Sequence, residues 1–193
     1  MGLLKKLWLQ ANIRSAHGSG DLKGMERVYK VRDPWNLTSE TEMFRHRATA
    51  SFIESRLPVP LGSILEVGCG EGAQTRALAS MAKKIVGVDP SPEAIERARQ
   101  QSIANANFVV GDLLGYPVPQ DKFDLVTACE VLYYLKDLEE GFHKLGQLGR
   151  HALVTYFQGE AERLDRFFNT KVVETTLISH QNQQWRLVFW TVS

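Results

Sequence analysis

The chain has 193 residues, which suits one α/β domain and is too short for two full ones. Apolar residues make up 44% and charged residues 23%, so an ordinary globular core is expected. The net charge of +1 argues against a dedicated nucleic-acid-binding protein.

Two cysteines, Cys69 and Cys129, give neither a disulfide framework nor a zinc-binding spacing, so no metal site is predicted. No apolar run reaches the roughly 18 residues that a membrane span needs. The first residues lack the apolar segment and cleavage site of a signal peptide. We therefore expect a cytoplasmic protein without a transmembrane segment.

The first 62 residues are predicted to form a helical cap on the core that follows. Apolar residues recur at helical spacing between residues 3 and 11, and residues 1–32 carry an excess of Lys and Arg. We favour a helix that packs its apolar face on the domain. The alternative is a basic helix that makes weak contact with a membrane surface or a partner.

A second helix of the cap is predicted over residues 39–56. Ser39 stands at the N-cap, with Glu42 three residues on, which is the spacing of a capping box. Helical periodicity places four apolar residues on its buried side, namely Phe44, Ala48, Phe52 and Ile53.

From residue 63 onward, short apolar strands alternate with helices. Strands are predicted at 63–67, 84–88, 107–110, 125–129 and 152–156, and helices at 71–82, 92–102 and 137–148. This alternation predicts a parallel sheet with right-handed crossovers. Residues 171–179 and 184–192 are β-rich and are predicted to pair as a terminal hairpin. The expected fold is one α/β domain with a seven-stranded, mostly parallel sheet, helices on both faces, a cap over 1–62 and a core over 63–193.

Residues 63–72 read Ser-Ile-Leu-Glu-Val-Gly-Cys-Gly-Glu-Gly, an apolar strand that ends in three alternating glycines and then a helix. This arrangement lets a nucleotide-like ligand lie against bare backbone. The next strand ends in Asp89, about 20 residues later, where a carboxylate can bind the two hydroxyls of a ribose.

Two further acids follow later strands. Asp112 follows the third strand, where a carboxylate can accept from an adenine amino group, and Glu130 follows the fourth. Because ligands of open α/β sheets bind beyond the carboxyl ends of the strands, these residues predict a slot for a molecule with an adenine, a ribose and an amino-acid tail. Glu66 lies inside an apolar strand, so we expect a cationic or N–H partner for it near the amino-acid end of that ligand.

The glycine turn alone leaves two ligands open, since Gly68, Gly70 and Ala73 also fit the pattern used for dinucleotides. Asp112 separates the two readings, because a dinucleotide enzyme has no standing need for an acid at that place. The rivals are an NAD(P)-dependent oxidoreductase and a binding module that keeps the slot without turnover. The chain lacks a convincing Tyr-x-x-x-Lys pair for hydride transfer.

The stretches 66–72, 88–91 and 111–113, taken together, resemble the class I S-adenosylmethionine-dependent methyltransferases. The resemblance covers about residues 60–157 and implies a Rossmann-like fold with S-adenosyl-L-methionine as cofactor. It implies that the glycine turn approaches the methionine part, that Asp89 holds the ribose and that Asp112 meets the adenine. The predicted cofactor-binding residues are Glu66, Gly68, Cys69, Gly70, Asp89, Pro90, Asp112, Leu113 and Cys129. Both cysteines are interpreted as packing residues and not as nucleophiles.

A narrower resemblance rests on Asp33-Pro34-Trp35 and on residues 130–135, which are similar to the nodulation protein S branch of this family. That branch N-methylates the free amine of a deacetylated chitooligosaccharide. The resemblance implies a small-molecule or oligosaccharide amine as acceptor. It does not extend to the first 32 residues, and the helix after Trp35 matches only loosely.

Three residues are predicted to be catalytic: Glu130, Tyr133 and Trp35. Glu130 would orient the acceptor amine, or else serve as a helix N-cap or a structural carboxylate. Tyr133 and Tyr134 would line the acceptor pocket, with one of the pair packing in the core. Trp35 would close over the site, or else anchor an irregular segment. Residues 45–47 are interpreted as a solvated helix face, the alternative being contact with the carboxylate of the cofactor.

Overall fold

The computed structural model describes residues 8, 11–13, 22–168 and 173–192. The predicted helix over residues 3–11 lies largely outside the described residues, so its packing and its contact with a membrane stay predictions. Trp8, within that segment, has 42% of its side chain exposed. No helix among the described residues combines the length and the apolar character that crossing a membrane would need.

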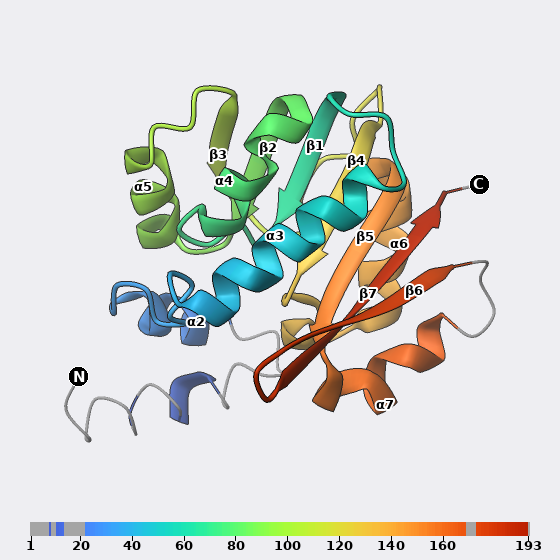
Figure 1. Ribbon diagram of the computed structural model, residues 1–193. Coiled ribbons are helices and arrows are strands. Elements are labelled where there is room, and N and C mark those ends of the chain that lie inside the picture. Colours follow the sequence, from blue (N-terminus) through green and yellow to red (C-terminus); the bar gives the residue numbers. More distant parts are fainter. Residues whose placement is uncertain (1–7, 9–10, 14–21, 169–172, 193) are drawn as a thin grey trace.

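A seven-stranded sheet forms the centre of the molecule, as predicted (Figure 1). The spatial order of the strands is β3-β2-β1-β4-β5-β7-β6, and only β7 runs against the direction of the others. The strands are β1 (Leu61–Val67), β2 (Ala82–Asp89), β3 (Ala106–Val110), β4 (Phe123–Cys129), β5 (Gly149–Phe157), β6 (Glu174–His180) and β7 (Gln183–Thr191).

The strand order reverses between β1 and β4, which is where open α/β sheets bind ligands. The register pairs Val67, the last residue of β1, with both Val88 of β2 and Ala128 of β4. The carboxyl ends of these three strands therefore lie level with one another. The loops that follow them meet at one edge of the sheet.

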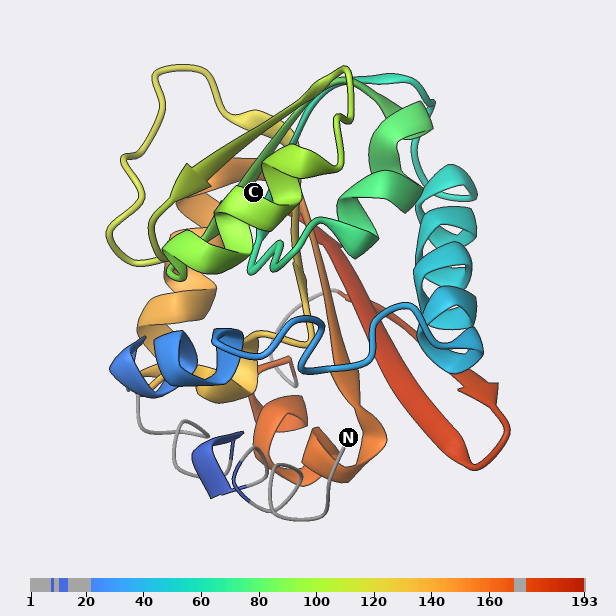
Figure 2. The same ribbon diagram turned by 90° about the vertical axis from the view of Figure 1, so that its left-hand side faces the viewer.

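Helices cover both faces of the sheet, and Figures 1 and 2 show α3 and α6 on opposite sides. The α-helices are α2 (Leu22–Tyr29), α3 (Glu40–Glu54), α4 (Ala73–Leu78), α5 (Pro92–Gln100), α6 (Leu138–Leu148) and α7 (Ala161–Leu164). Short 3-10 turns are η1 (Ala79–Met81), η2 (Leu132–Tyr134), η3 (Gln158–Glu160) and η4 (Asp165–Phe167). Ser39, Ser91 and Asp137 cap α3, α5 and α6 with side-chain acceptors.

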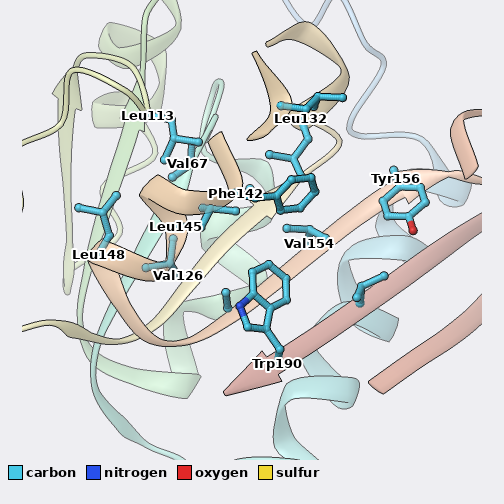
Figure 3. Packing of buried hydrophobic residues seen from close by; sticks show 14 of the residues in the cluster. Val67, Leu113, Val126, Leu132, Phe142, Leu145, Leu148, Val154, Tyr156 and Trp190 are labelled. Carbon is cyan, nitrogen blue, oxygen red and sulfur yellow. The ribbon is translucent and has the colours of Figure 1, made fainter. Parts of the chain in front are cut away.

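The apolar strands bury side chains on both faces because successive residues of a strand point in opposite directions. Val67, Val126 and Val154 pack against Phe142 and Leu145 of α6 in one cluster (Figure 3). The opposite cluster joins strand residues with α3, namely Ile64, Ile85, Leu125 and Leu153 with Phe52 and Ile53. Full burial of each such side chain stabilises the fold by about 1.5–3 kcal/mol.

Two helices differ from the prediction in what they bury. The helix predicted over 71–82 is the shorter α4 followed by a 3-10 turn. In α3, Phe44 and Ala48 are only half-buried, whereas Arg45, His46 and Thr49 are buried together with Phe52 and Ile53. The cause lies in the tertiary structure, because α3 turns a polar stripe toward a cavity at the edge of the sheet.

Candidate functional site

A cavity of about 440 Å³ lies beyond the carboxyl ends of the strands, a size typical of small-molecule sites. Its walls include every residue that the sequence predicted as cofactor-binding or catalytic, so those twelve residues share one site. They are Trp35, Glu66, Gly68, Cys69, Gly70, Asp89, Pro90, Asp112, Leu113, Cys129, Glu130 and Tyr133. Their individual roles remain predictions.

The glycine turn after β1 is built on left-handed backbone. The φ angles of Gly68, Gly70 and Gly72 are +67°, +53° and +84°, a region that side chains disfavour. A Cβ atom on Gly68 would collide with Val131, and one on Gly70 would lie 2.9 Å from the hydroxyl of Tyr29. Conformation therefore favours glycine at all three positions and space does so at Gly68 and Gly70, whose bare backbone borders the cavity.

Asp89, at the end of β2, ties the glycine turn to the next helix. Its Oδ2 accepts from the backbone N–H of Gly70 at 3.0 Å, and its Oδ1 accepts from that of Ser91 at 2.9 Å. The side chain is 4% exposed, and burial raises the pKa of Asp89 to about 6. Each carboxylate oxygen can accept a second hydrogen bond, so Asp89 retains the capacity to bind two ligand hydroxyls.

Asp112 stands in the loop after β3, on the wall of the same cavity as Asp89. Its Oδ1 accepts from the backbone N–H of Gly115 at 2.9 Å, which closes a tight turn. Leu113 beside it is buried and gives that wall an apolar surface. The two acids are thus brought together as the sequence predicted.

Glu66 is 2% exposed and accepts a hydrogen bond from the hydroxyl of Thr75 on α4. Burial raises the pKa of Glu66 to about 8, against the opposing effects of that hydrogen bond and of the Arg45 charge. The residue that hydrogen-bonds to Glu66 is therefore a hydroxyl donor, and the prediction of a cationic or N–H donor in direct contact is wrong. Arg45 acts on Glu66 through its charge.

Arg45 and His46 of α3 are 3% and 5% exposed, so the solvated face expected at residues 45–47 is wrong for both. Arg47 alone is exposed. The Arg45 Nε donates to Glu42 at 2.9 Å, and its Nη2 lies 3.0 Å from His46 Nε2. Burial and the adjacent Arg45 lower the pKa of His46 to about 3, so the imidazole is neutral and accepts from Arg45.

Glu130, directly after β4, is held at both carboxylate oxygens. Thr155 Oγ1 donates to Oε1 at 2.9 Å, and the Tyr133 hydroxyl donates to Oε2 at 3.0 Å. Burial raises the pKa of Glu130, while Arg45 and these two hydrogen bonds act to lower it. The side chain does not cap a helix, because η2 has no side-chain cap. The N-cap alternative is therefore wrong.

Three aromatic rings form a wall next to Glu130. The ring centroids of Tyr133 and Tyr134 are 4.8 Å apart, and those of Tyr134 and Trp35 are 5.8 Å apart. Tyr133 also packs against the core, and both tyrosines line the cavity. Trp35 Nε1 donates to the hydroxyl of Tyr29 at 3.3 Å, and both residues line the cavity.

An ion pair between α5 and the glycine turn, which was not predicted from the sequence, hydrogen-bonds to residues 29–33. Arg97 of α5 lies 2.7 Å from Glu71 and also donates to the carbonyls of Tyr29 and Val31 at 2.9 and 3.2 Å. Glu71 in turn accepts from the backbone N–H of Asp33 at 2.9 Å. Residues 29–33 are thereby held against the glycine turn.

Residues 64–152 match a family model described as a methyltransferase domain. Over these residues the chain is similar to methyltransferases, as the motifs at 66–72, 88–91 and 111–113 predicted. The nodulation protein S of Bradyrhizobium diazoefficiens is 37% identical over 119 residues, which are 60% of this chain and 56% of that protein. The nodulation protein S of Rhizobium tropici is 34% identical over 128 residues, 65% of this chain and 53% of that protein. The chain thus spans about half the length of the curated relatives it matches.

A solved structure supports the fold of the chain. The N-methyltransferase NodS from Bradyrhizobium japonicum WM9, in complex with S-adenosyl-L-homocysteine, superposes with a TM-score of 0.72 at 23% identity. The match covers 89% of this chain and 97% of that one. The sheet and helices of the two chains therefore share one architecture. The match to the methyltransferase domain model favours a methyltransferase over an NAD(P)-dependent oxidoreductase.

The residues of the cavity fit the cofactor of this family, S-adenosyl-L-methionine. Gln74 of α4 is buried on the cavity wall, accepts from Arg45 Nη1 at 3.3 Å, and leaves its Nε2 without a partner among the described residues. A buried amide donor beside a guanidinium suits a carboxylate. Arg45 and Gln74 would hold the carboxylate of the cofactor, while Glu66 would face its ammonium group.

Proposed function

We propose that this methyltransferase transfers a methyl group from S-adenosyl-L-methionine to the free amine of an amino sugar or oligosaccharide. The observation that carries the proposal is the placement of Glu130, a carboxylate fixed by two hydroxyl donors between the glycine turn and an aromatic wall. The similarity to nodulation protein S supports an amine acceptor.

The charge of the cavity favours an amine over an anionic acceptor. Five acids line it, and one of them, Glu66, is largely uncharged at neutral pH because burial raises its pKa to about 8. Two charged basic residues accompany them, of which Arg45 is already paired with Glu42. A site with this balance attracts a cationic amine and repels a carboxylate or phosphate. The acids are Glu42, Glu66, Asp89, Asp112 and Glu130, and the bases are Arg45 and Lys136.

The chain's own residues mainly position the acceptor, because the cofactor, when bound, supplies the activated methyl carbon. The amine reacts in its unprotonated form, after its ammonium proton has passed to solvent. Glu130 accepts one of its remaining N–H groups, which turns the nitrogen lone pair toward that carbon. The carboxylate then receives the proton that the nitrogen loses. The rings of Trp35, Tyr133 and Tyr134 flank the amine, which is cationic once methylated, and they exclude water.

Replacing Glu130 by Gln keeps the size of the side chain and removes its charge and its basicity. We expect kcat/KM for the acceptor to fall by about 100-fold or more, since general-base and orienting groups contribute on that order. The assay is mass spectrometry of a deacetylated chitooligosaccharide incubated with the cofactor and the enzyme.

The fully acetylated oligosaccharide, which has no free amine, is the matched control and should gain no methyl group. Calorimetry should give wild-type affinity of the E130Q variant for S-adenosyl-L-homocysteine. Equal methylation by E130Q and wild type would contradict the role of Glu130. Tight cofactor binding without any product from amine, hydroxyl or carboxyl acceptors would favour a binding module instead.

A further inference from the structure

Two buried threonines on neighbouring strands differ in one respect. Thr127 of β4 and Thr155 of β5 are both fully buried. The Thr155 hydroxyl donates to Glu130 Oε1 at 2.9 Å, whereas the Thr127 hydroxyl has no partner among the described residues. Thr155 is absent from the cavity wall, so it stands behind Glu130 and not beside a ligand.

Thr155 contacts Glu130 through its backbone as well as its side chain. The Thr155 carbonyl accepts from the backbone N–H of Glu130 at 2.9 Å. Glu130 has a φ of +60°, a left-handed conformation that disfavours any residue other than glycine. Such a conformation persists when surrounding contacts fix it. Here one residue fixes both the main chain and the carboxylate of Glu130.

We infer that Thr155 is a positioning residue, which holds the Glu130 carboxylate in the orientation that receives the acceptor amine. This inference rests on the proposed function of Glu130. Because the Thr155 hydroxyl donates to the ionised carboxylate, it also acts to lower the pKa of Glu130. Other groups that act on Glu130 are Arg45 and Glu42 from α3 and Tyr133 from η2. The charge of Glu130 in turn raises the pKa of Tyr134 from η2 and of Cys129 from β4.

The test compares Thr155→Val, Thr155→Ser and Thr127→Val with wild type. Thr155→Val preserves shape and removes the hydroxyl, so kcat with the deacetylated oligosaccharide should fall about ten- to hundredfold, the range of one hydrogen bond to a charged group. The acidic limb of its kcat/KM profile should move to higher pH. Affinity for S-adenosyl-L-homocysteine should stay unchanged. Thr155→Ser should restore both the rate and the profile.

Thr127→Val removes a hydroxyl of the same burial that has no partner, and it should behave as wild type. A ¹³C NMR titration of glutamate-labelled protein gives a readout that needs no acceptor, with Glu130 assigned by the signal missing from E130Q. In Thr155→Val the Glu130 titration should move to higher pH.

An unchanged Glu130 titration in Thr155→Val would overturn the inference, and so would equal losses in Thr155→Val and Thr127→Val. A wild-type enzyme that leaves the oligosaccharide unmethylated, but whose Glu130 titration moves in Thr155→Val, would refute the proposed acceptor alone.

Discussion

The Asp89→Asn variant is expected to bind S-adenosyl-L-homocysteine about 100-fold more weakly than wild type and to unfold more easily. The carboxylate accepts from the N–H groups of Gly70 and Ser91 at once, and an amide can accept at only one of its two ends. The NH₂ group would face a donor, which leaves a buried N–H unpaired at about 1–3 kcal/mol. The ribose would lose a charged acceptor as well. Isothermal calorimetry and urea unfolding measure the two effects.

Asp124→Asn is the matched control for this experiment. Asp124 also accepts from two backbone N–H groups, those of Gly62 and Ser63 at 2.8 and 3.0 Å, but both donate to its Oδ2, and they lie at the opposite end of β1. The amide oxygen of Asn can accept both, so we expect this variant to lose less stability than Asp89→Asn and to keep its affinity for the cofactor product. Wild-type affinity in Asp89→Asn would contradict the role given to Asp89.

Glu66→Gln is expected to stabilise the free protein at alkaline pH while weakening its binding of S-adenosyl-L-homocysteine. Burial raises the pKa of Glu66 from 4.5 to about 8. An acid whose pKa rises on folding favours the fold when protonated, and this contribution is lost as the pH climbs from about 4.5 through 8. The total loss is on the order of 3–5 kcal/mol. Gln keeps an acceptor for Thr75 and does not ionise.

The measurement is urea unfolding of the free protein at pH 5 and at pH 8.5. The stability of Glu66→Gln minus that of wild type should rise between the two values, because only wild type must then bury an ionised carboxyl. Calorimetry at pH 7 in buffers of different ionisation enthalpy should show proton release when wild type binds a ligand carrying an ammonium group. The variant should release fewer protons and bind roughly tenfold more weakly. A stability difference independent of pH would refute this account of Glu66.

The glycine turn, Asp89, Asp112 and Glu130 could be located from the sequence because each lies at the carboxyl end of a strand or just after it. Parallel strands joined by helices must place their carboxyl ends on one edge, so local patterns were enough to bring these residues together. The predicted ends of the strands were less accurate, and β1, for example, begins at Leu61 and not at residue 63. Strand boundaries depend on pairing with neighbours, which a single run of residues does not reveal.

Gln74 and Tyr29 were missed, and contact of Arg45 with the cofactor was only the alternative to a solvated face, because these residues reach the cavity from helices. Helical spacing assigned Phe44 and Ala48 to the buried side of α3, but the angle at which α3 docks on the sheet turns Arg45 and His46 inward. One sequence signal favours the buried position of Arg45 over a solvated face. Glu66 is an acid within an apolar strand and calls for a nearby positive charge, and the cap helix supplies three basic residues at 45–47.

The central claim is that the ends of β1, β2 and β3 form one cradle for a methyl donor that carries adenosine. The most direct measurement is calorimetric titration of the purified full chain with S-adenosyl-L-homocysteine and, separately, with NAD. The account predicts saturable binding of S-adenosyl-L-homocysteine and no binding of NAD. Saturable NAD binding, or no heat from S-adenosyl-L-homocysteine with a folded protein, would contradict it.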